Sequence, residues 1–336
     1  MERILITGGA GFIGHHLVNK LLPQRQYRII VVDNLSSRKK RKLFSGKSKR
    51  VAMSIPLLLH EEDILNKDRI FNIFSHEGVD TCIHLAAKTS VSDSIKNPYC
   101  TVYVNLIGTL NILEACYKHG VKNFIFASSA AVYGEPQKLP ISEEDPLRPL
   151  SIYGASKVAG EALVSSYRNA GKIENTVSLR IFNVYGEGQS PDYAGVITAF
   201  IERLSKGLPP IIYGDGTQTR DFISVQDVIN AIILAAKRSD RKKTSAPLLP
   251  SVFNIGTGIE VSVNDLAIKT IKLFGLELSP LYRDRISNED IRRSCADISR
   301  SIEKLNFNIT NDLDHGLNQI LRPSDSHTDI DTKNDV

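Results

Sequence analysis

The chain has 336 residues, 42% of them hydrophobic, and a formal charge of +5 at neutral pH, a composition typical of a globular protein. Eight basic residues and no acidic ones lie within Arg38–Arg50, so the rest of the chain sums to −3 and lacks the broad positive charge of a nucleic-acid-binding domain. No apolar run reaches the ~20 residues of a membrane span, and Met1 leads directly into an apolar run, which argues against a signal peptide. The four cysteines show no metal-ligand spacing, so we expect no metal site, no nucleic-acid partner and a cytoplasmic location.

The N-terminal stretch follows the order strand, glycine-rich turn, helix, strand. Two apolar runs, Ile4–Thr7 and Tyr27–Asp33, flank the turn and a helix-compatible segment. In such a unit Gly8 allows a tight turn, Gly11 lets the backbone approach a pyrophosphate, and Gly14 lets the helix pack on the strand. The start of the helix directs backbone N–H groups and a favourable dipole at the phosphates. The pattern therefore predicts a dinucleotide-binding site.

Asp33 ends the second strand of this unit, about 20 residues beyond the glycines, where a carboxylate bonds the hydroxyls of the adenosine ribose. Because a carboxylate repels a 2′-phosphate, we expect NAD rather than NADP. The basic segment Arg38–Arg50 follows directly. The charge pattern favours a solvated surface loop, and two alternatives remain open: a patch for a polyanion or membrane surface, and a contact from Arg38 to a 2′-phosphate.

Beyond the basic segment, strand and helix patterns continue to alternate. They predict strands at residues 57–64, 80–85, 122–127 and 175–183, and helices at residues 65–76, 100–119 and 151–170. The alternation predicts an α/β fold, a Rossmann-like doubly wound parallel sheet with helices on both faces. Ligands of such sheets lie beyond the carboxyl ends of the strands. We interpret His84, at one of these ends, as a packed side chain rather than a catalyst.

The regular alternation loosens after Asn183. A turn at Gly214–Gly216, a short strand at Arg220–Val225 and further helices indicate a smaller, discontinuous lobe. We therefore expect an NAD-binding Rossmann domain over residues 1–183, to which parts of residues 220–258 return. Residues 184–322 are expected to form mainly a substrate-binding lobe, and the polar residues 323–336 a disordered tail.

Tyr153 and Lys157 lie four residues apart in a predicted helix, so the phenol and the ammonium share one face. A phenol with an ordinary pKa of about 10 is a poor base at neutral pH, and a neighbouring cation lowers that pKa. Tyr-x-x-x-Lys alone is common on helix surfaces. The pattern becomes specific because the glycine motif precedes it and Ser128-Ser129 lies between the two.

These motifs, from Thr7–Gly14 to Tyr153–Lys157, resemble the short-chain dehydrogenase/reductase superfamily, in the extended branch that modifies nucleotide sugars. The resemblance implies that Tyr153 is the catalytic acid/base, that Ser129 shares its proton path, and that Lys157 lowers the pKa of the tyrosine and binds the nicotinamide ribose. It assigns to NAD the residues Gly8, Gly11, Phe12, Ile13, Gly14, Asp33, Asn34, Asp63, Ile64, Leu85, Ala86, Ala87, Asn105, Tyr153 and Lys157.

The segments Arg180–Gly186 and Gly214–Phe222 are similar to the substrate side of nucleotide-sugar 4-epimerases. The resemblance implies that Asn183 and Arg220 hold a diphosphate, an anion suited to an arginine fork. Related dehydratases and decarboxylases carry an acid in the serine motif for a second proton transfer, where this chain has Ala130-Ala131. The residues assigned to the nucleotide sugar are Ser129, Asn183, Val196, Tyr213, Arg220, Arg285, Asp290 and Ser294.

The resemblance thus implies an NAD-dependent epimerase that inverts C4 of a UDP-hexose through a transient 4-keto sugar. Two alternatives remain: another epimerase or reductase of nucleotide sugars, and a non-catalytic NAD-binding regulator, against which the complete Ser129, Tyr153 and Lys157 set argues. The family also implies a homodimer, in which helices 100–119 and 151–170 pair into a four-helix bundle.

The resemblance also bears on substrate range through the segment Asp290–Asp297, which in the family closes over the substrate. Ser294 occupies a gate position on the C2 side of the sugar, where tyrosine limits the pocket to a hydroxyl and a small residue leaves room for an N-acetyl group. We therefore expect UDP-GlcNAc and UDP-GalNAc to be accepted as well as UDP-Glc and UDP-Gal; alternatively, Ser294 only packs a loop. At the position where the family has an arginine that binds the diphosphate, this chain has Ser287. A short insertion in this segment would either bring Arg285 to the diphosphate or move Ser294 away from the gate position.

Overall fold

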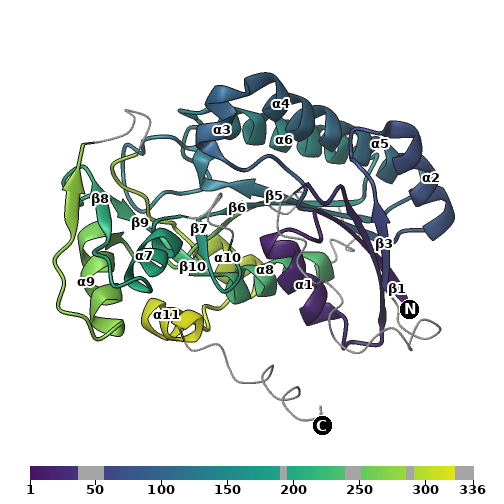
Figure 1. Ribbon diagram of the computed structural model, residues 1–336. Helices are drawn as coiled ribbons and strands as arrows, with labels where there is room; N and C mark the ends of the chain where they lie inside the picture. The colour runs from purple at the N-terminus through teal and green to yellow at the C-terminus, as the bar shows by residue number, and fades with distance from the viewer. Residues whose placement is uncertain (37–56, 190–194, 239–250, 285–290, 322–336) are drawn as a thin grey trace, which may run out of the picture.

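The computed structural model describes residues 1–36, 57–189, 195–238, 251–284 and 291–321 (Figure 1). The basic loop 38–50, the polar tail, Arg285 and Asp290 lie outside these residues, and the predictions for them stay predictions. Within the described part of the chain, no helix is long and apolar enough to cross a bilayer, and no group of His, Cys, Asp and Glu side chains is arranged to hold a metal ion.

Seven parallel strands form the central sheet in the order β11-β6-β5-β4-β1-β2-β3. They are β1 (Glu2–Thr7), β2 (Tyr27–Asp33), β3 (Leu57–Glu61), β4 (Thr81–His84), β5 (Asn123–Ser129), β6 (Asn175–Ile181) and β11 (Val252–Ile255). The strand order reverses between β1 and β4, so a crevice opens past their carboxyl ends, where ligands of such sheets bind. The expected Rossmann-like doubly wound sheet is confirmed.

Helices cover both faces of this sheet (Figure 1): α1 (Phe12–Leu21) and α8 (Val225–Lys237) on one side, α2 (Lys67–Glu77), α5 (Thr109–Lys118) and α6 (Ile152–Asn169) on the other. Side chains alternate between the two cores along each strand. In β1, Ile4 and Ile6 pack toward α1 and α8, whereas Leu5 packs toward α2 and α5. In β1 and β2 the sequence is a nearly continuous apolar run, because both faces of these strands are buried.

A smaller lobe lies beside the carboxyl ends of the strands (Figure 1). A third apolar core, which includes Tyr185, Phe200 and Leu317, joins its helices. The chain returns from this lobe to the large sheet through α8 and β11 before it completes the lobe. Its elements are β7 (Asn183–Tyr185), α7 (Val196–Leu204), β8 (Ile211–Tyr213), β9 (Thr219–Arg220), β10 (Phe222–Ser224), β12 (Val261–Ser262), α9 (Val263–Leu273), β13 (Leu281–Arg283) and α11 (Leu313–Leu321).

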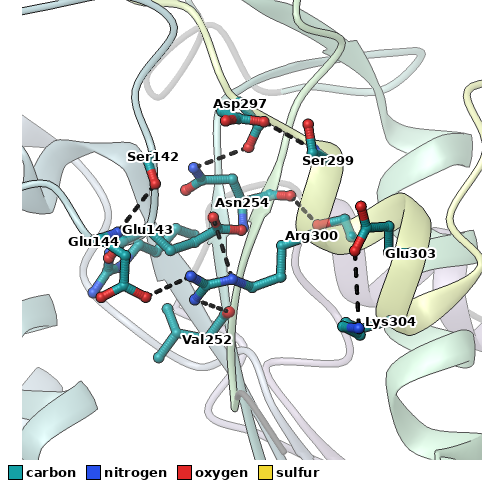
Figure 2. Close-up of polar contacts among 12 residues, drawn as sticks. Ser142, Glu143, Glu144, Val252, Asn254, Asp297, Ser299, Arg300, Glu303 and Lys304 are labelled. Atoms are coloured by element: carbon teal, nitrogen blue, oxygen red, sulfur yellow. Dashed lines mark hydrogen bonds and ion pairs between the residues drawn. The ribbon is translucent and has the colours of Figure 1, made fainter.

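A buried amide on β11 connects the C-terminal segments to the chain that follows β5 (Figure 2). Asn254 donates from its backbone N–H to Glu143 (2.8 Å) and from Nδ2 to the carbonyls of Ile141 (2.8 Å) and Asp297 (3.2 Å). Burial raises the pKa of Glu143, and the hydrogen bond from Asn254 opposes that rise. Arg300, on α10 (Ser299–Leu305), lies 3.6 Å from the Glu143 carboxylate. These contacts therefore fix the chain where it enters α10.

The expected helix over residues 100–119 is present as a continuous helical run with one irregularity. It consists of α4 (Pro98–Val102), a π-helical turn (Tyr103–Gly108) and α5, and an unexpected short helix, α3 (Val91–Lys96), precedes it. At the end of the π turn, a Cβ on Gly108 would lie 2.4 Å from a terminal carbon of Ile64, so the helix packs closely there. Hydrophobic periodicity does not reveal such a local change of hydrogen bonding.

Two expected strands are shorter than predicted. The third strand ends at Glu61, because the Asp63 carboxylate accepts a hydrogen bond from Leu65 N (2.9 Å) and forms a turn. The expected strand 175–183 divides into β6 and β7. Asn183 leaves the large sheet and donates its N–H to the carbonyl of Asp221 (3.0 Å), which starts the sheet of the smaller lobe.

His84 is a packed side chain within the sheet, as the sequence indicated. Its ring nitrogens lie 2.6 Å from Thr7 Oγ1 and 3.0 Å from Thr109 Oγ1, and its ring stacks on Phe126. Burial, with a smaller effect from the charge of Lys157, lowers the pKa of His84 from 6.5 to about 3. The folded protein therefore holds this imidazole neutral.

His84 is expected to make the fold sensitive to acid. Below pH 6.5 His84 binds a proton in the unfolded chain, whereas in the folded chain it does not bind one until about pH 3. The stability of the fold therefore falls as the pH falls through this window. We expect His84→Gln to lower stability at neutral pH but to flatten its decline below pH 6.5, as measured by urea unfolding at a series of pH values. His76→Gln, at an exposed site, is the control and should keep the wild-type slope; an unchanged slope in His84→Gln contradicts the prediction.

Candidate active site

A cleft of about 1390 Å³ runs across the carboxyl ends of the strands and into the smaller lobe. It exceeds the ~300–1,000 Å³ of a typical small-molecule site, so it has room for two ligands side by side. The expected site residues that line it are Gly8, Gly11, Phe12, Ile13, Gly14, Asp33, Asn34, Asp63, Ile64, Leu85, Ala86, Ala87, Ser129, Tyr153, Lys157, Asn183, Val196, Tyr213, Arg220 and Ser294.

The glycine turn provides a close-fitting backbone surface for a pyrophosphate. Gly8 has φ +70°, and a Cβ there would lie 2.7 Å from the amide nitrogen of Ala86. A Cβ on Gly14 would lie 2.2 Å from the carbonyl oxygen of Gly8, so the helix and the turn touch without side chains between them. Helix α1 follows at once, with Gly11 as its N-cap residue. These features fit a dinucleotide, whose phosphates bind at helix N-termini.

Two carboxylates are held in place at the far end of this turn. Asp33 accepts hydrogen bonds from Ala10 N (2.9 Å) and Leu35 N (2.8 Å). Asp63 accepts one from Asn34 Nδ2 (2.8 Å). Since backbone groups fix Asp33 at the end of β2 and it lines the cleft, its position is consistent with bonding to a ribose.

Asn105 does not line the cleft, unlike the other described residues assigned to NAD. It is buried in the π turn, where it accepts a hydrogen bond from Lys88 N (2.7 Å) and donates to Lys88 O (2.9 Å) and Ser156 Oγ (2.9 Å). Asn105 thus holds the loop after β4 against α6. Its action on the cleft is indirect, through the positions of these two elements.

The three residues with implied catalytic roles come together from two elements. Ser129 ends β5, while Tyr153 and Lys157 lie on α6, which Ser151 caps by accepting from Gly154 N (3.0 Å). Lys157 Nζ donates to the carbonyl of Ala127 (2.8 Å) and lies 5.9 Å from the centre of the Tyr153 ring. The ammonium is therefore fixed beside the phenol.

The electrostatics of this group suit an exchange of protons. Burial raises the pKa of Tyr153, and a hydrogen bond with Ser129 lowers it. Burial lowers the pKa of Lys157 to about 8, against the opposing effect of Glu161, so at pH 7 the lysine is mostly protonated. The Lys157 charge favours the phenolate, whose formation burial otherwise disfavours.

A buried ion pair that the sequence analysis missed lies beneath the catalytic residues. Arg180 on β6 and Glu161 on α6 approach to 2.8 Å, with 5% and 7% of their side chains exposed. Glu161 also accepts from Ser128 Oγ (2.5 Å), next to Ser129. Glu161 follows Lys157 by four residues, so the helical spacing that joined Tyr153 and Lys157 is the signal that could have found it.

On the substrate side, the fully buried carboxylate of Asp221 joins three segments. It accepts hydrogen bonds from Thr257 N (2.7 Å), Gly258 N (2.9 Å) and Ala296 N (3.0 Å). Burial raises the pKa of Asp221, and these bonds oppose the rise. Because Asp221 follows Arg220 and holds Ala296, it fixes the arginine relative to Ser294, which is 1% exposed and lines the cleft.

The fold and the cleft together define a dinucleotide-dependent enzyme of the Rossmann type. The sequence profile of the NAD dependent epimerase/dehydratase family matches residues 4–256, and the chain belongs to this family. Its cofactor is NAD.

Three characterised relatives show how far the similarity extends. UDP-glucose 4-epimerase from Mycolicibacterium smegmatis is 34% identical over 308 residues, 91% of this chain and 93% of that protein. The crystal structure of UDP-glucose 4-epimerase from Thermotoga maritima with UDP-glucose is 36% identical, with a TM-score of 0.83 over 96% of this chain and 99% of that one. UDP-N-acetylglucosamine 4-epimerase from Methanobrevibacter ruminantium M1, in complex with UDP-N-acetylmuramic acid, is 33% identical, with a TM-score of 0.84 over 96% and 97%.

Proposed function

We propose that the protein is an NAD-dependent UDP-sugar 4-epimerase that interconverts UDP-Glc and UDP-Gal and also accepts UDP-GlcNAc and UDP-GalNAc. The main support is the composition of the cleft around Ser129, where the next two residues, Ala130 and Ala131, also line the cleft and carry no acid. Such a site can oxidise and reduce a sugar but has no evident group for eliminating water. The relatives act on UDP-glucose or UDP-N-acetylglucosamine by their names.

The position of the acidic residues strengthens this choice of reaction. The carboxylates among the described residues that line the cleft are Asp33, Glu62 and Asp63, which end or follow β2 and β3. The strands β1 and β4 separate β2 and β3 from β5, which carries Ser129. A second acid/base of the kind that a dehydratase requires is therefore distant from the catalytic residues in the described part of the cleft.

In the proposed mechanism, the Tyr153 phenolate takes the proton from the C4 hydroxyl of the sugar, and the resulting phenol later returns it. Lys157 stabilises the phenolate, and Ser129, which is hydrogen-bonded to Tyr153, shares this proton path. NAD, when bound, would supply the redox chemistry, a reversible exchange of hydride with C4 of the sugar. Between these transfers the 4-keto sugar turns about its diphosphate link and presents its other face. The glycine turn, Asp33 and Lys157 hold the cofactor.

We propose that the two lobes bind different ligands. The large sheet with β11 and α8 would bind NAD, and the smaller lobe would bind the nucleotide sugar. Asn183 and Arg220 are assigned to the diphosphate, Ser294 to the C2 side of the sugar, and Val196 and Tyr213 to the nucleotide sugar in general. The family resemblance places Asp290 near the ribose of the nucleotide, and Arg285 binds the diphosphate if the short insertion restores it there.

We also propose a homodimer in the cytoplasm. The cytoplasmic location rests on Cys82, Cys100, Cys116 and Cys295, which are free thiols, as expected in a reducing compartment. The dimer rests on an apolar surface along α3, α4 and the π turn, where soluble proteins rarely expose such side chains together. The exposed side chains there are Val91, Ile95, Tyr99, Val102 and Tyr103.

The direct test of the activity is to incubate the protein with UDP-Glc, UDP-GlcNAc and UDP-glucuronic acid and to separate the C4 epimers.

Replacement of the acid/base then tests the mechanism. We expect Tyr153→Phe to keep NAD bound but to reduce turnover by about two to four powers of ten, the usual effect of losing a positioned acid/base. Tyr117→Phe, on α5, is the matched control and should keep full turnover. Unchanged turnover in Tyr153→Phe would sink the assignment.

The gate position is tested by increasing its size. Ser294→Tyr should suppress turnover of UDP-GlcNAc and UDP-GalNAc by about tenfold or more, because a buried ring fills the space for the N-acetyl group, and should preserve that of UDP-Glc and UDP-Gal. Ser294→Ala is the control, expected to leave the ratio of kcat/KM for the two sugars unchanged. Equal losses on both pairs in Ser294→Tyr refute the gate.

The dimer is tested by placing a charge on the proposed interface. Tyr103, on the π turn, is 61% exposed, and Ile268, on α9 of the smaller lobe, is 60% exposed, which makes them a matched pair. By light scattering at micromolar concentration we expect a dimer for the wild type and for Ile268→Glu, and a monomer for Tyr103→Glu, since a carboxylate cannot be buried there without a partner. A monomeric wild type contradicts the proposed assembly.

A further inference from the structure

Residues 291–297, which precede α10, form part of the wall on the substrate side of the cleft. Ile291 and Ser294 line the cleft. Between them, Arg292 and Arg293 turn to the outer surface, with 42% and 57% of their side chains exposed. These two guanidinium groups therefore act on the outside of the wall, and their effect on a ligand in the cleft is indirect.

Each arginine forms a two-point contact with one carboxylate of the smaller lobe. Arg292 donates from Nη1 and Nη2 to the two oxygens of Asp215 (3.1 and 2.9 Å), in the turn between β8 and β9. Arg293 donates from Nε and Nη2 to those of Glu260 (3.0 and 2.6 Å), directly before β12. The arginines hold the pKa of both carboxyl groups below the usual range, so both pairs are charged at neutral pH. Forked contacts of this kind fix orientation as well as distance.

Thr219 connects both pairs to the arginine assigned to the diphosphate. Its N–H donates to the carbonyl of Arg292 (3.0 Å), and its hydroxyl donates to the Glu260 carboxylate (2.5 Å). Its own carbonyl accepts from Nη1 of Arg220 (2.7 Å), which lines the cleft. A displacement of either outer pair is therefore transmitted to Arg220, the neighbour of Thr219 on β9.

The C-terminal end of residues 291–297 is held in a different way. Ala296 N donates to the buried carboxylate of Asp221 (3.0 Å), and Asp297 N donates to the carbonyl of Ile141 (2.8 Å). The first of these contacts is buried, whereas both arginine pairs are open to solvent and are weakened by salt. Ser294 lies between the two kinds of contact, so its position depends on the charged pairs from one side only.

We propose that Asp215 and Glu260 are positioning residues for the nucleotide sugar. They hold the two outer arginines, and through them keep Ser294 and Arg220 at a fixed separation on the substrate side of the cleft. This inference rests on the proposed action on UDP-sugars. Loss of either carboxylate charge should weaken the binding of the nucleotide sugar and leave the chemical step unchanged, because the catalytic residues lie on β5 and α6 of the large domain.

The test compares Asp215→Asn, Glu260→Gln and the double variant with the wild type. We expect each single change to raise KM for UDP-Glc about threefold and the double change about tenfold, with kcat preserved, because exposed ion pairs have modest energies. The Kd of UDP for the NAD-loaded protein, measured by calorimetry, should rise by the same factors. Variants that unfold at a lower temperature but keep the wild-type KM and Kd assign these residues to stability alone and overturn the inference.

Salt provides a second measurement on the same proteins. An increase from about 50 mM to about 500 mM KCl should raise KM more in the wild type than in the double variant, which has already lost both charged pairs. Screening of the diphosphate itself affects the two proteins equally. The same salt dependence in both proteins therefore contradicts the inference.

Asp314→Asn is the matched control. Asp314 forms an exposed two-point contact with Lys269 on another side of the smaller lobe (2.7 and 2.9 Å), so this variant should keep the wild-type KM, Kd and salt dependence. An equal rise of KM in the control overturns the role of the two outer pairs alone. Wild-type protein that neither binds UDP nor converts any UDP-sugar overturns the proposed function and the inference together.

Discussion

The buried ion pair between Glu161 and Arg180 is the interaction on which the geometry of the cleft depends. One carboxylate binds the guanidinium and the Ser128 hydroxyl, and so joins α6, β6 and the end of β5. Removing one member of such a pair leaves an uncompensated charge and costs about 3–5 kcal/mol. Catalytic residues on two different elements keep a common geometry because those elements are joined directly beneath them, in a place that water does not reach.

The same guanidinium extends this connection toward the C-terminal segments. Arg180 donates to the hydroxyl of Tyr133 (2.9 Å), which in turn donates to the side-chain oxygen of Asn254 (2.5 Å). Asn254 holds the carbonyl of Asp297, three residues beyond Ser294. A continuous series of polar contacts therefore runs from the end of β5 to the segment that contains Ser294. Ser129, on β5, and this segment are positioned by one network, although more than a hundred residues separate them in the chain.

The local features of this architecture can be predicted from the sequence, whereas the contacts between distant segments cannot. The glycine turn, Asp33 and the Tyr153–Lys157 spacing were predictable, because each depends on residues a few positions apart whose backbone conformation or helical face decides the outcome. The π turn that ends at Gly108 was not, although the helix packs closely against Ile64 there. Asn254 and Asp221 were also missed. A buried amide or carboxylate has no periodicity of its own, and its significance lies in which donors and acceptors the tertiary structure brings to it.

The crossing of the chain between the two lobes restricts how the enzyme can move. Asp221 holds both Thr257, after β11, and Ala296, before α10, and Asn254 holds both the chain after β5 and the segment before α10. A hinge opening of one whole lobe would have to break these hydrogen bonds at the same time. The two lobes are therefore expected to keep one arrangement. In the proposed reaction it is then the sugar, and not the protein, that changes its orientation.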